Sequence, residues 1–219
     1  FASQFGLREV MLTFSRYGLT PNEALRCWKR WGASTVSKIE ENPYLLCSAG
    51  LYIGFERADQ ICMGMHRLPD DPRRIEAGIL YVLRHNLSNG HTCLPADKLI
   101  PTTMQLLQVG EEAVTDVLSS MVSAFTVKEE EMEGRRFLFL NHLHQAERFI
   151  AARIRLMTGF PPVANPYIDA GIDAIERSNH IRYESQQRLA ITEAVEKGTL
   201  ILTGGPGTGK TTTLRAIIT

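Results

Sequence analysis

The alternation of apolar and polar residues predicts a chain built mainly of helices. Up to about residue 66, short stretches with helical spacing of apolar residues alternate with tight-turn signals. These signals are Tyr17-Gly18, Asn42-Pro43 and Ile53-Gly54. Because helices of this length are not stable alone, we expect them to pack against one another.

Two helix starts are especially clear. Thr20 can cap a helix that begins at Pro21, and Glu23 three positions later completes a capping box. Asp71-Pro72 opens a longer helix by the same logic, and Asn89-Gly90 ends it. The apolar residues of this longer helix share one face: Ile75, Ile79, Leu80, Leu83 and Leu87.

The next fifty residues combine helices with strands. The expected elements are an extended piece at His91–Leu94, helices near 95–108 and 110–124, and strands at Phe125–Lys128 and Arg135–Leu140. The two strands flank the polar turn Glu131–Gly134 and predict a β-hairpin. Helices followed by a hairpin indicate a winged helix.

The last part of the chain carries a proline-rich segment between helices. A helix over 141–157 is followed by the linker 158–166, which is the best candidate for a domain boundary. Two further helices precede the apolar strand Thr199–Thr203. The fold class is therefore mainly α with a small β-hairpin.

The most specific motif follows that strand. GGPGTGKT matches GxxxxGK[ST] in a strand–loop–helix context. Its glycines let successive N–H groups point inward, and the helix N-terminus adds positive charge, so the loop can cradle a polyphosphate. Lys210 would neutralise the outer phosphates and Thr211 would bind Mg²⁺. The expected phosphate-binding residues are Gly204, Gly205, Pro206, Gly207, Thr208, Gly209, Lys210, Thr211 and Thr212.

Upstream of the loop, Gln187 is a candidate for base recognition. An amide carries both a donor and an acceptor and can pair with the hydrogen-bonding edge of adenine. The alternative is a solvated glutamine at a helix start.

Composition and charge narrow the class of protein. Hydrophobic residues make up 44% of the 219 residues and charged residues 22%, which argues against a disordered chain. The sequence has no apolar run of membrane-spanning length and no signal peptide, and its four cysteines form no CxxC pair. We therefore expect a cytoplasmic protein with reduced thiols and no membrane contact.

The net charge of zero hides an asymmetry along the chain. Residues 1–90 carry +2, residues 91–147 carry −5 and residues 148–219 carry +3. Because an acidic face opposes phosphate, any DNA contact is expected on the flanking segments. Ordinary variation of surface charge is the alternative.

Several motifs together resemble a known family. Gln187–Ala190 followed by TGGPGTGKTTT is similar to the nucleotide-binding start of RecD-type helicases of superfamily 1, relatives of the exodeoxyribonuclease V alpha subunit. The stretches NPYLLCSAGLYIGFERADQI, DDPRRIEAGILYVL and GHTCLP resemble the N-terminal region of the longer RecD-like proteins. The P-loop is common to many ATPases, so the other stretches make the resemblance specific.

The resemblance implies an ATP-driven DNA helicase that moves 5′ to 3′ on single-stranded or tailed DNA, in DNA repair or recombination. It implies that Lys210 and Thr211 hold ATP·Mg and that Gln187 reads adenine. The chain is expected to be an excised piece that lacks the rest of the catalytic machinery and is inactive alone. The alternative is a DNA-structure-binding module of loader type with a nucleotide-switched P-loop.

The resemblance also gives the expected domains. They are a tandem helix-hairpin-helix-like domain at 1–68, a winged-helix-like domain at 69–147, connecting helices and linker at 148–182, and the start of a RecA-like ATPase domain at 183–219.

Two hairpins in the first of these domains are candidate DNA contacts. Each would offer backbone N–H groups to a phosphate, and each has lost one glycine of the family pattern, with Thr20 and Tyr52 in the glycine positions. The candidate residues are Gly18, Thr20, Ile53, Gly54 and Arg57. The alternative is a helical packing domain that keeps the fold without binding DNA.

The third helix of the winged-helix segment would ordinarily enter the major groove. Here it presents Glu111, Glu112 and Asp116 and no Lys or Arg, so duplex reading is not expected. A protein partner on the acidic 91–147 segment fits this surface better.

Overall fold

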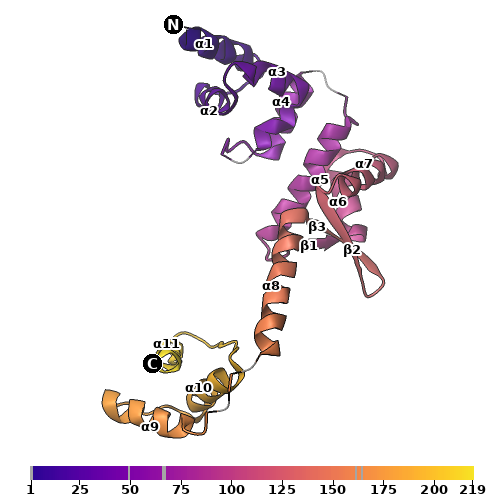
Figure 1. Cartoon of the computed structure of the whole chain (residues 1–219). Helices are drawn as coiled ribbons and strands as arrows, with labels where there is room; N and C mark the ends of the chain where they lie inside the picture. The colour runs from indigo at the N-terminus through magenta and orange to yellow at the C-terminus, as the bar shows by residue number, and fades with distance from the viewer. Residues whose placement is uncertain (1, 49, 66–67, 161, 164) are drawn as a thin grey trace. The chain divides into compact units, whose positions relative to one another are not determined.

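The chain divides into two compact units (Figure 1). The computed structural model describes residues 2–48, 50–65, 68–160, 162–163 and 165–219. Unit 1 comprises residues 1–144 and unit 2 comprises residues 145–219. The predicted linker contains Pro161 and Ala164, which lie outside the described residues. The sequence-based domain boundaries at 68, 147 and 182 stay predictions.

The first half of unit 1 is a set of short helices joined by capped turns. Thr20 Oγ1 accepts a hydrogen bond from Glu23 N, and Glu23 Oε2 accepts one from Thr20 N at 2.7 Å, so the predicted capping box is confirmed. Asn42 caps the next turn by accepting a hydrogen bond from Tyr44 N. The elements are α1 (Ala2–Ser15), α2 (Pro21–Trp31), η1 (Gly32–Ser34), α3 (Thr35–Glu41), η2 (Pro43–Cys47) and α4 (Phe55–Gly64).

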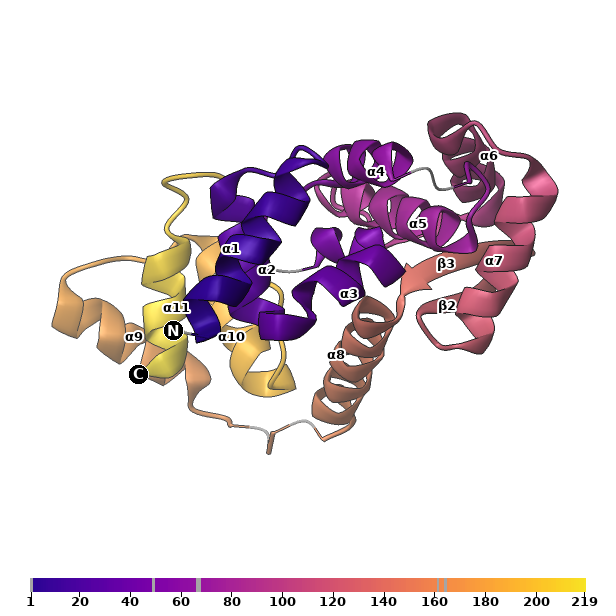
Figure 2. The same ribbon diagram turned by 90° about the horizontal axis from the view of Figure 1, so that it is seen from above.

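The second half of unit 1 has the order of a winged helix. The elements are α5 (Pro72–Leu87), β1 (Cys93–Pro95), α6 (Ala96–Leu107), α7 (Glu111–Ser123), β2 (Val127–Met132), β3 (Arg135–Leu140) and the start of α8 (Asn141–Gly159). The strands form an antiparallel sheet in the order β1-β3-β2, with Leu94 opposite Leu138 and Val127 opposite Leu140. The helices α5, α6 and α7 pack together beside this sheet (Figure 2). The fold class predicted from the sequence is confirmed.

The hairpin is tighter than predicted. The strand β2 continues to Met132, so only Glu133 and Gly134 form the turn, with φ of +53° and +73°. Two successive residues with positive φ match the twist of the flanking strands. Phe125 was expected in the strand but has φ +57° and is exposed, because it belongs to the turn that ends α7.

One hydrophobic core runs through both halves of unit 1. Residue Gly78 on α5 lies so close to Leu107 on α6 that an added Cβ would be 2.8 Å from the leucine side chain. The largest fully buried side chains of this core include Phe14, Ile39, Leu46, Leu51, Ile75, Ile79, Leu99, Leu107, Leu118 and Leu138.

An ion pair between the buried Arg74 and the partly buried Asp59 joins the two halves. The guanidinium of Arg74 donates to both carboxylate oxygens of Asp59 at 2.8 and 2.9 Å and to the carbonyl oxygens of Pro69 and Leu107. The Tyr44 hydroxyl donates to the same Asp59 at 2.6 Å, and the pKa of Tyr44 is raised by burial and by this bond. The NPY, ERAD and DDPRRIEAG stretches that carry the family resemblance thus meet in one network.

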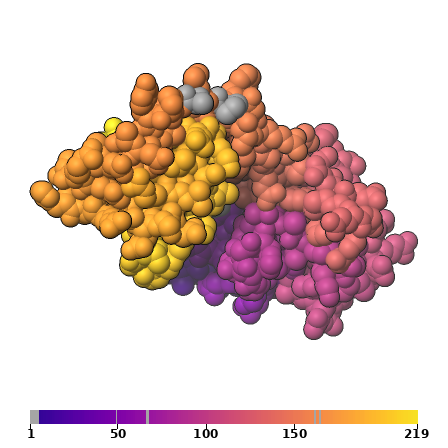
Figure 3. Space-filling view, turned by 90° about the horizontal axis from the view of Figure 1, so that it is seen from below, coloured from indigo at the N-terminus to yellow at the C-terminus, as the bar shows by residue number. Residues whose placement is uncertain are grey.

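Unit 2, orange to yellow in Figure 3, contains the rest of α8, then α9 (Ile168–Asn179), α10 (Ser185–Lys197) and α11 (Lys210–Ile218). Its buried core consists of Ile172, Tyr183, Ile191 and Ala216. Arg188 joins α10 to α9 by donating to Asp173 and Glu176.

The predicted strand Thr199–Thr203 is not a strand here. It has no regular secondary structure, and Ile201 is 84% exposed. A strand needs neighbours to accept and donate its backbone hydrogen bonds, and the described part of unit 2 supplies none.

Candidate nucleotide and DNA sites

The P-loop connects the irregular segment after α10 to the N-terminus of α11. Gly207 and Gly209 have φ of +78° and +77°, the left-handed conformation that glycine adopts without steric cost. The helix α11 begins at Lys210, so the N–H groups of its first turn have no partner within the helix. The loop therefore ends in the backbone arrangement that binds anions.

Lys210 lies against the loop that precedes it. Its Nζ donates to the carbonyl oxygens of Gly204 at 2.7 Å and Gly205 at 2.6 Å, and Thr208 Oγ1 donates to Gly205 O at 3.0 Å. These bonds hold the ammonium group beside the loop. Thr211 is exposed in the first turn of α11, where its hydroxyl is accessible.

Gln187 also contacts the loop. Its Nε2 donates to Thr208 O at 3.3 Å, and its Oε1 accepts a hydrogen bond from Glu184 N at 3.0 Å as part of the cap of α10. A Cβ added at Gly209 would displace this amide, and the φ of +77° at Gly209 also disfavours any side chain there. Gln187, Lys210 and Thr211 are thus brought to the same loop.

The two predicted hairpins have equivalent backbones. Gly18 and Tyr52 have φ of +80° and +57°. Leu19 and Ile53, the next residues, are each only 5% exposed. Thr20 and Gly54 then begin α2 and α4 from nearly identical extended conformations. Tyr52, which replaces the family glycine, keeps the left-handed backbone of that glycine.

The first hairpin is closed by its own side chains. Thr20 N and Glu23 N are both occupied in the capping box, and the Glu23 carboxylate lies at the N-terminus of α2. Burial disfavours the charged form of Glu23, but hydrogen bonds from Arg57 and from Thr20 outweigh it and lower the pKa of the carboxyl. A carboxylate at this position opposes a phosphate.

The second hairpin has no such cap. Gly54 offers no side chain to the N-terminus of α4, and nothing lies within 4 Å of the position its Cβ would take. Tyr52 is 86% exposed. Ile53 is only 5% exposed, so a phosphate at this hairpin would meet its backbone rather than its side chain.

Arginines cross-link the two hairpins. Arg57 on α4 donates to Gly18 O at 2.7 Å and to Glu23 at 3.0 Å. Arg26 on α2 donates to Leu51 O at 2.8 Å, and its guanidinium lies 5.9 Å from the centre of the Tyr52 ring. This reciprocal arrangement joins residues 25 and 39 positions apart, so no local sequence pattern could predict it.

The winged-helix surface carries paired charges. Arg135 donates to Asp97 at 2.9 Å, and Arg136 donates to Glu129 at 2.7 Å, which lowers the pKa of that carboxyl. The basic pair on the hairpin is therefore already neutralised by carboxylates.

Comparison with known proteins identifies the type of chain. Residues 3–93 match the family described as the ATP-dependent RecD2 DNA helicase HHH domain, and residues 187–219 match the family described as the AAA domain. The first match contains both hairpins and the second contains Gln187 and the P-loop. The chain thus resembles RecD-type helicases.

A curated relative supports the same assignment. The RecD-like chain is 28% identical to the ATP-dependent RecD2 DNA helicase of Deinococcus radiodurans, in an alignment covering 98% of this chain. The chain spans 31% of the length of that relative. None of the helices that the structure describes has the length and apolar character of a membrane span.

Proposed function

We propose that this RecD-like chain is the ATP-binding and helix-hairpin-helix part of an ATP-dependent DNA helicase. The observation that carries the proposal is the P-loop geometry, in which the Lys210 ammonium is held by Gly204 O and Gly205 O next to the start of α11. The RecD2-type helix-hairpin-helix match in the same chain supports DNA as the substrate.

The P-loop residues fit ATP and Mg²⁺. The backbone N–H groups of Gly205 and of Gly207 to Lys210, together with the start of α11, suit the phosphates, and Lys210 would neutralise their outer oxygens. The Thr211 hydroxyl would bind Mg²⁺, which when bound offsets charge on the phosphates. Gln187 would contact adenine, in exchange for at least one of its present hydrogen bonds.

We propose the second hairpin, at Gly54, as the principal backbone contact to DNA. The first turn of its helix carries the carboxylate of Glu56, but no side chain makes a capping hydrogen bond there, whereas Glu23 closes the first hairpin, where Gly18 and Thr20 lie. Arg57 contributes positive charge nearby, with 42% of its side chain exposed, although it is shared with Glu23. Such a contact would hold DNA irrespective of sequence.

The wider assignment also follows the RecD resemblance. We propose 5′-to-3′ movement on single-stranded DNA, a role in repair or recombination, a cytoplasmic location and a protein partner on the acidic 91–147 segment. The neutralised Arg135 and Arg136 support a protein rather than a duplex on that segment.

The nucleotide site is tested with the 219-residue chain and a fluorescent ATP analogue. Lys210→Ala should weaken binding at least about tenfold, because it removes a charge-assisted contact to phosphate. Lys197→Ala, which removes an exposed lysine of the same unit, is the matched control and should bind normally. Equal binding by both variants would refute the site. We expect no steady-state ATP hydrolysis by this chain alone.

The helicase assignment is tested with the protein encoded by the complete reading frame that contains this chain. Strand displacement is compared on duplexes with a 5′ or a 3′ single-stranded tail. Unwinding only from the 5′ tail, abolished by Lys210→Ala, is expected. DNA-stimulated ATP hydrolysis without unwinding of either substrate would favour the loader-type alternative.

A further inference from the structure

A pocket of about 360 Å³ lies beside the second hairpin, between the turn η2 and the helix α5. Its inner wall is apolar and its rim is polar and charged. The apolar residues are Leu45, Cys47, Ile53, Phe55, Ala77 and Leu80. Burial raises the pKa of the Cys47 thiol to about 11.

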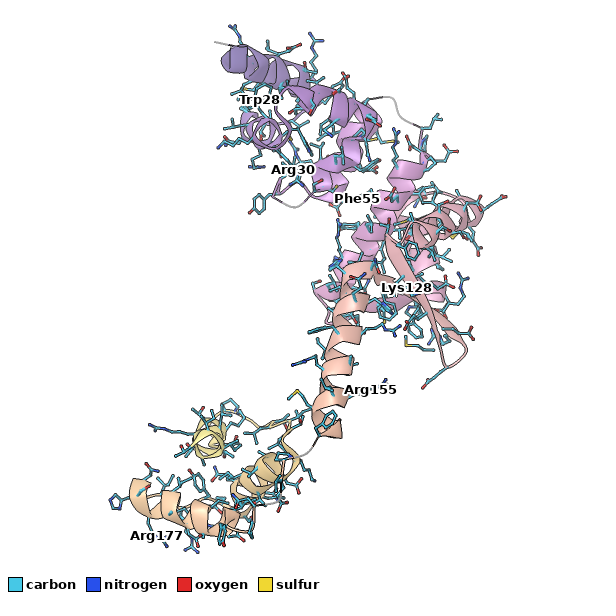
Figure 4. The ribbon with its side chains drawn as sticks, in the orientation of Figure 1. Trp28, Arg30, Phe55, Lys128, Arg155 and Arg177 are labelled. Carbon is cyan, nitrogen blue, oxygen red and sulfur yellow. The ribbon has the colours of Figure 1, made fainter. Side chains whose placement is uncertain are left out.

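A column of aromatic rings leads from the core to this pocket. Tyr44 and Phe55 stack with centroids 6.0 Å apart, and Phe55 and Tyr81 stack at 5.1 Å with an interplanar angle of 27°. Tyr81 is half-buried, and the centre of its ring lies 6.1 Å from that of the exposed His85. Figure 4 labels Phe55 where α4 approaches α5. A flat ring entering the pocket would meet the side chains of Tyr44, Phe55 and Tyr81, which line it.

The rim carries more positive than negative charge. Arg73 and Arg84 line the pocket from α5 and are exposed, and Glu76 is the one acidic side chain in the lining. Arg73 also donates to Glu41 O, which fixes its guanidinium at the rim. The uncapped residue Gly54 also lines the pocket, and the exposed Glu56 in the first turn of α4 accepts a hydrogen bond from the Tyr81 hydroxyl at 3.4 Å. Because the two arginines outnumber Glu76 in the lining, neighbouring phosphates would lie on these arginines and on the start of α4.

We propose that this pocket binds one unpaired base of single-stranded DNA, with its neighbouring phosphates on Arg73, Arg84 and the second hairpin. The chemistry matches the combination of aromatic stacking and backbone charge by which proteins hold single strands without reading sequence. A base in a duplex is stacked and paired, so the pocket would select an unpaired strand. The inference rests on the proposed DNA-binding function and deepens it.

The test measures binding of a fluorescent oligothymidine of twelve nucleotides to the 219-residue chain over a range of salt concentrations. Tyr81→Leu keeps an apolar side chain in the wall and removes the ring, and should weaken binding roughly tenfold, within the range for loss of one stacked base. Arg84→Ala should make the negative slope of the logarithm of the binding constant against the logarithm of salt concentration shallower by about 0.7, the value for one phosphate contact on a single strand. Arg8→Ala, at an exposed arginine of α1, is the charge-matched control and should leave the slope unchanged.

A second measurement localises the base. Photo-crosslinking with an oligonucleotide that carries 5-iodouracil should attach it to Tyr81 or Phe55, and a blunt duplex should not compete. Wild-type affinity and salt slope in both pocket variants, with no crosslink to these residues, would overturn the proposal. If these variants bind DNA normally but no longer bind a protein partner, the proposal would also be overturned, and the pocket would be a peptide site.

The outcome is separable from that of the proposed function. Tyr81 and Arg84 belong to unit 1 and the P-loop belongs to unit 2, so ATP binding should be normal in both variants. Loss of ATP binding in Lys210→Ala together with normal oligothymidine binding in the pocket variants would reject the pocket alone.

Discussion

In the first hairpin Gly18 has φ +80° and in the second Tyr52 has φ +57°, and in both the third residue starts a helix from an extended backbone. The chemistry at that third residue differs. Thr20 caps its helix together with the Glu23 carboxylate, whereas Gly54 leaves the N-terminus of α4 without a side-chain cap.

The difference shows that the same backbone can serve packing or binding. A capping box stabilises its helix and places a negative charge where a phosphate would lie. An uncapped N-terminus gives up that stabilisation and keeps N–H groups available. The first hairpin therefore suits packing, and the second suits a ligand.

The largest expected effect concerns how each hairpin's helix is anchored. Arg74→Ala leaves the Asp59 carboxylate of α4 without its buried partner and should lower the free energy of unfolding by about 3–5 kcal/mol. Arg57→Ala removes the more exposed pair that joins α4 to Glu23 of α2 and should cost about 1 kcal/mol or less. Urea unfolding followed by the fluorescence of Trp28 and Trp31, the two tryptophans of the sequence, measures both. Equal losses would show that the anchors do not differ.

The backbones of the hairpins are distinguished by alanine at each glycine. Gly18→Ala forces an L residue into the left-handed region and should destabilise by about 1–2 kcal/mol. Gly54 has φ −71° and open space where a Cβ would lie. Gly54→Ala should therefore change the free energy of unfolding by only about 0.5 kcal/mol. The same unfolding assay applies. A larger loss at Gly54 would mean that its backbone is more constrained than the structure indicates.

The cap of the first hairpin should be worth about 1 kcal/mol. Thr20→Ala removes the side-chain oxygen that accepts from Glu23 N and should lower the free energy of unfolding by that amount. Thr20→Ser keeps the oxygen and is the control. If alanine and serine behave alike, the capping hydrogen bond contributes nothing measurable.

The smallest expected effect is the pH dependence of the first hairpin. Because the pKa of Glu23 is lowered from its ordinary value of 4.5, its carboxylate stabilises the fold above about pH 4.5. That stabilisation, at most about 1 kcal/mol for so exposed a partner, is lost as pH falls through the folded pKa. The urea midpoint should therefore fall less between pH 7 and pH 4 in Glu23→Gln than in the wild type. Identical pH profiles would contradict the role of this carboxylate.

Local patterns predicted much of the fold. The caps at Thr20 and Asp71 and the helices that follow them are formed by residues a few positions apart, and the structure confirms them. The end of β2 was misplaced, because the pairing of Met132 with Arg135 extends the strand beyond its apolar residues. The strand at Thr199–Thr203 was predicted from its apolar run, but strand formation depends on partner strands.

The candidate sites divide in the same way. The P-loop was read from its motif, because its glycines, Lys210 and Thr211 are contiguous and its geometry is set by the local backbone. The contact of Gln187 with Thr208 needed the structure, since it spans 21 positions. The roles of the individual P-loop and hairpin residues stay predictions.

The sequence by itself determined the helices, their caps, the P-loop and the RecD resemblance, because each of these depends on residues close together in the chain. Only the tertiary structure decided which hairpin is closed, how Tyr44, Asp59 and Arg74 meet, and where an aromatic pocket opens beside Gly54. Those features join residues 15 to 39 positions apart. Hydrogen bonds and stacking act over a few ångströms, so they exist only once the packing of the core has brought these residues together.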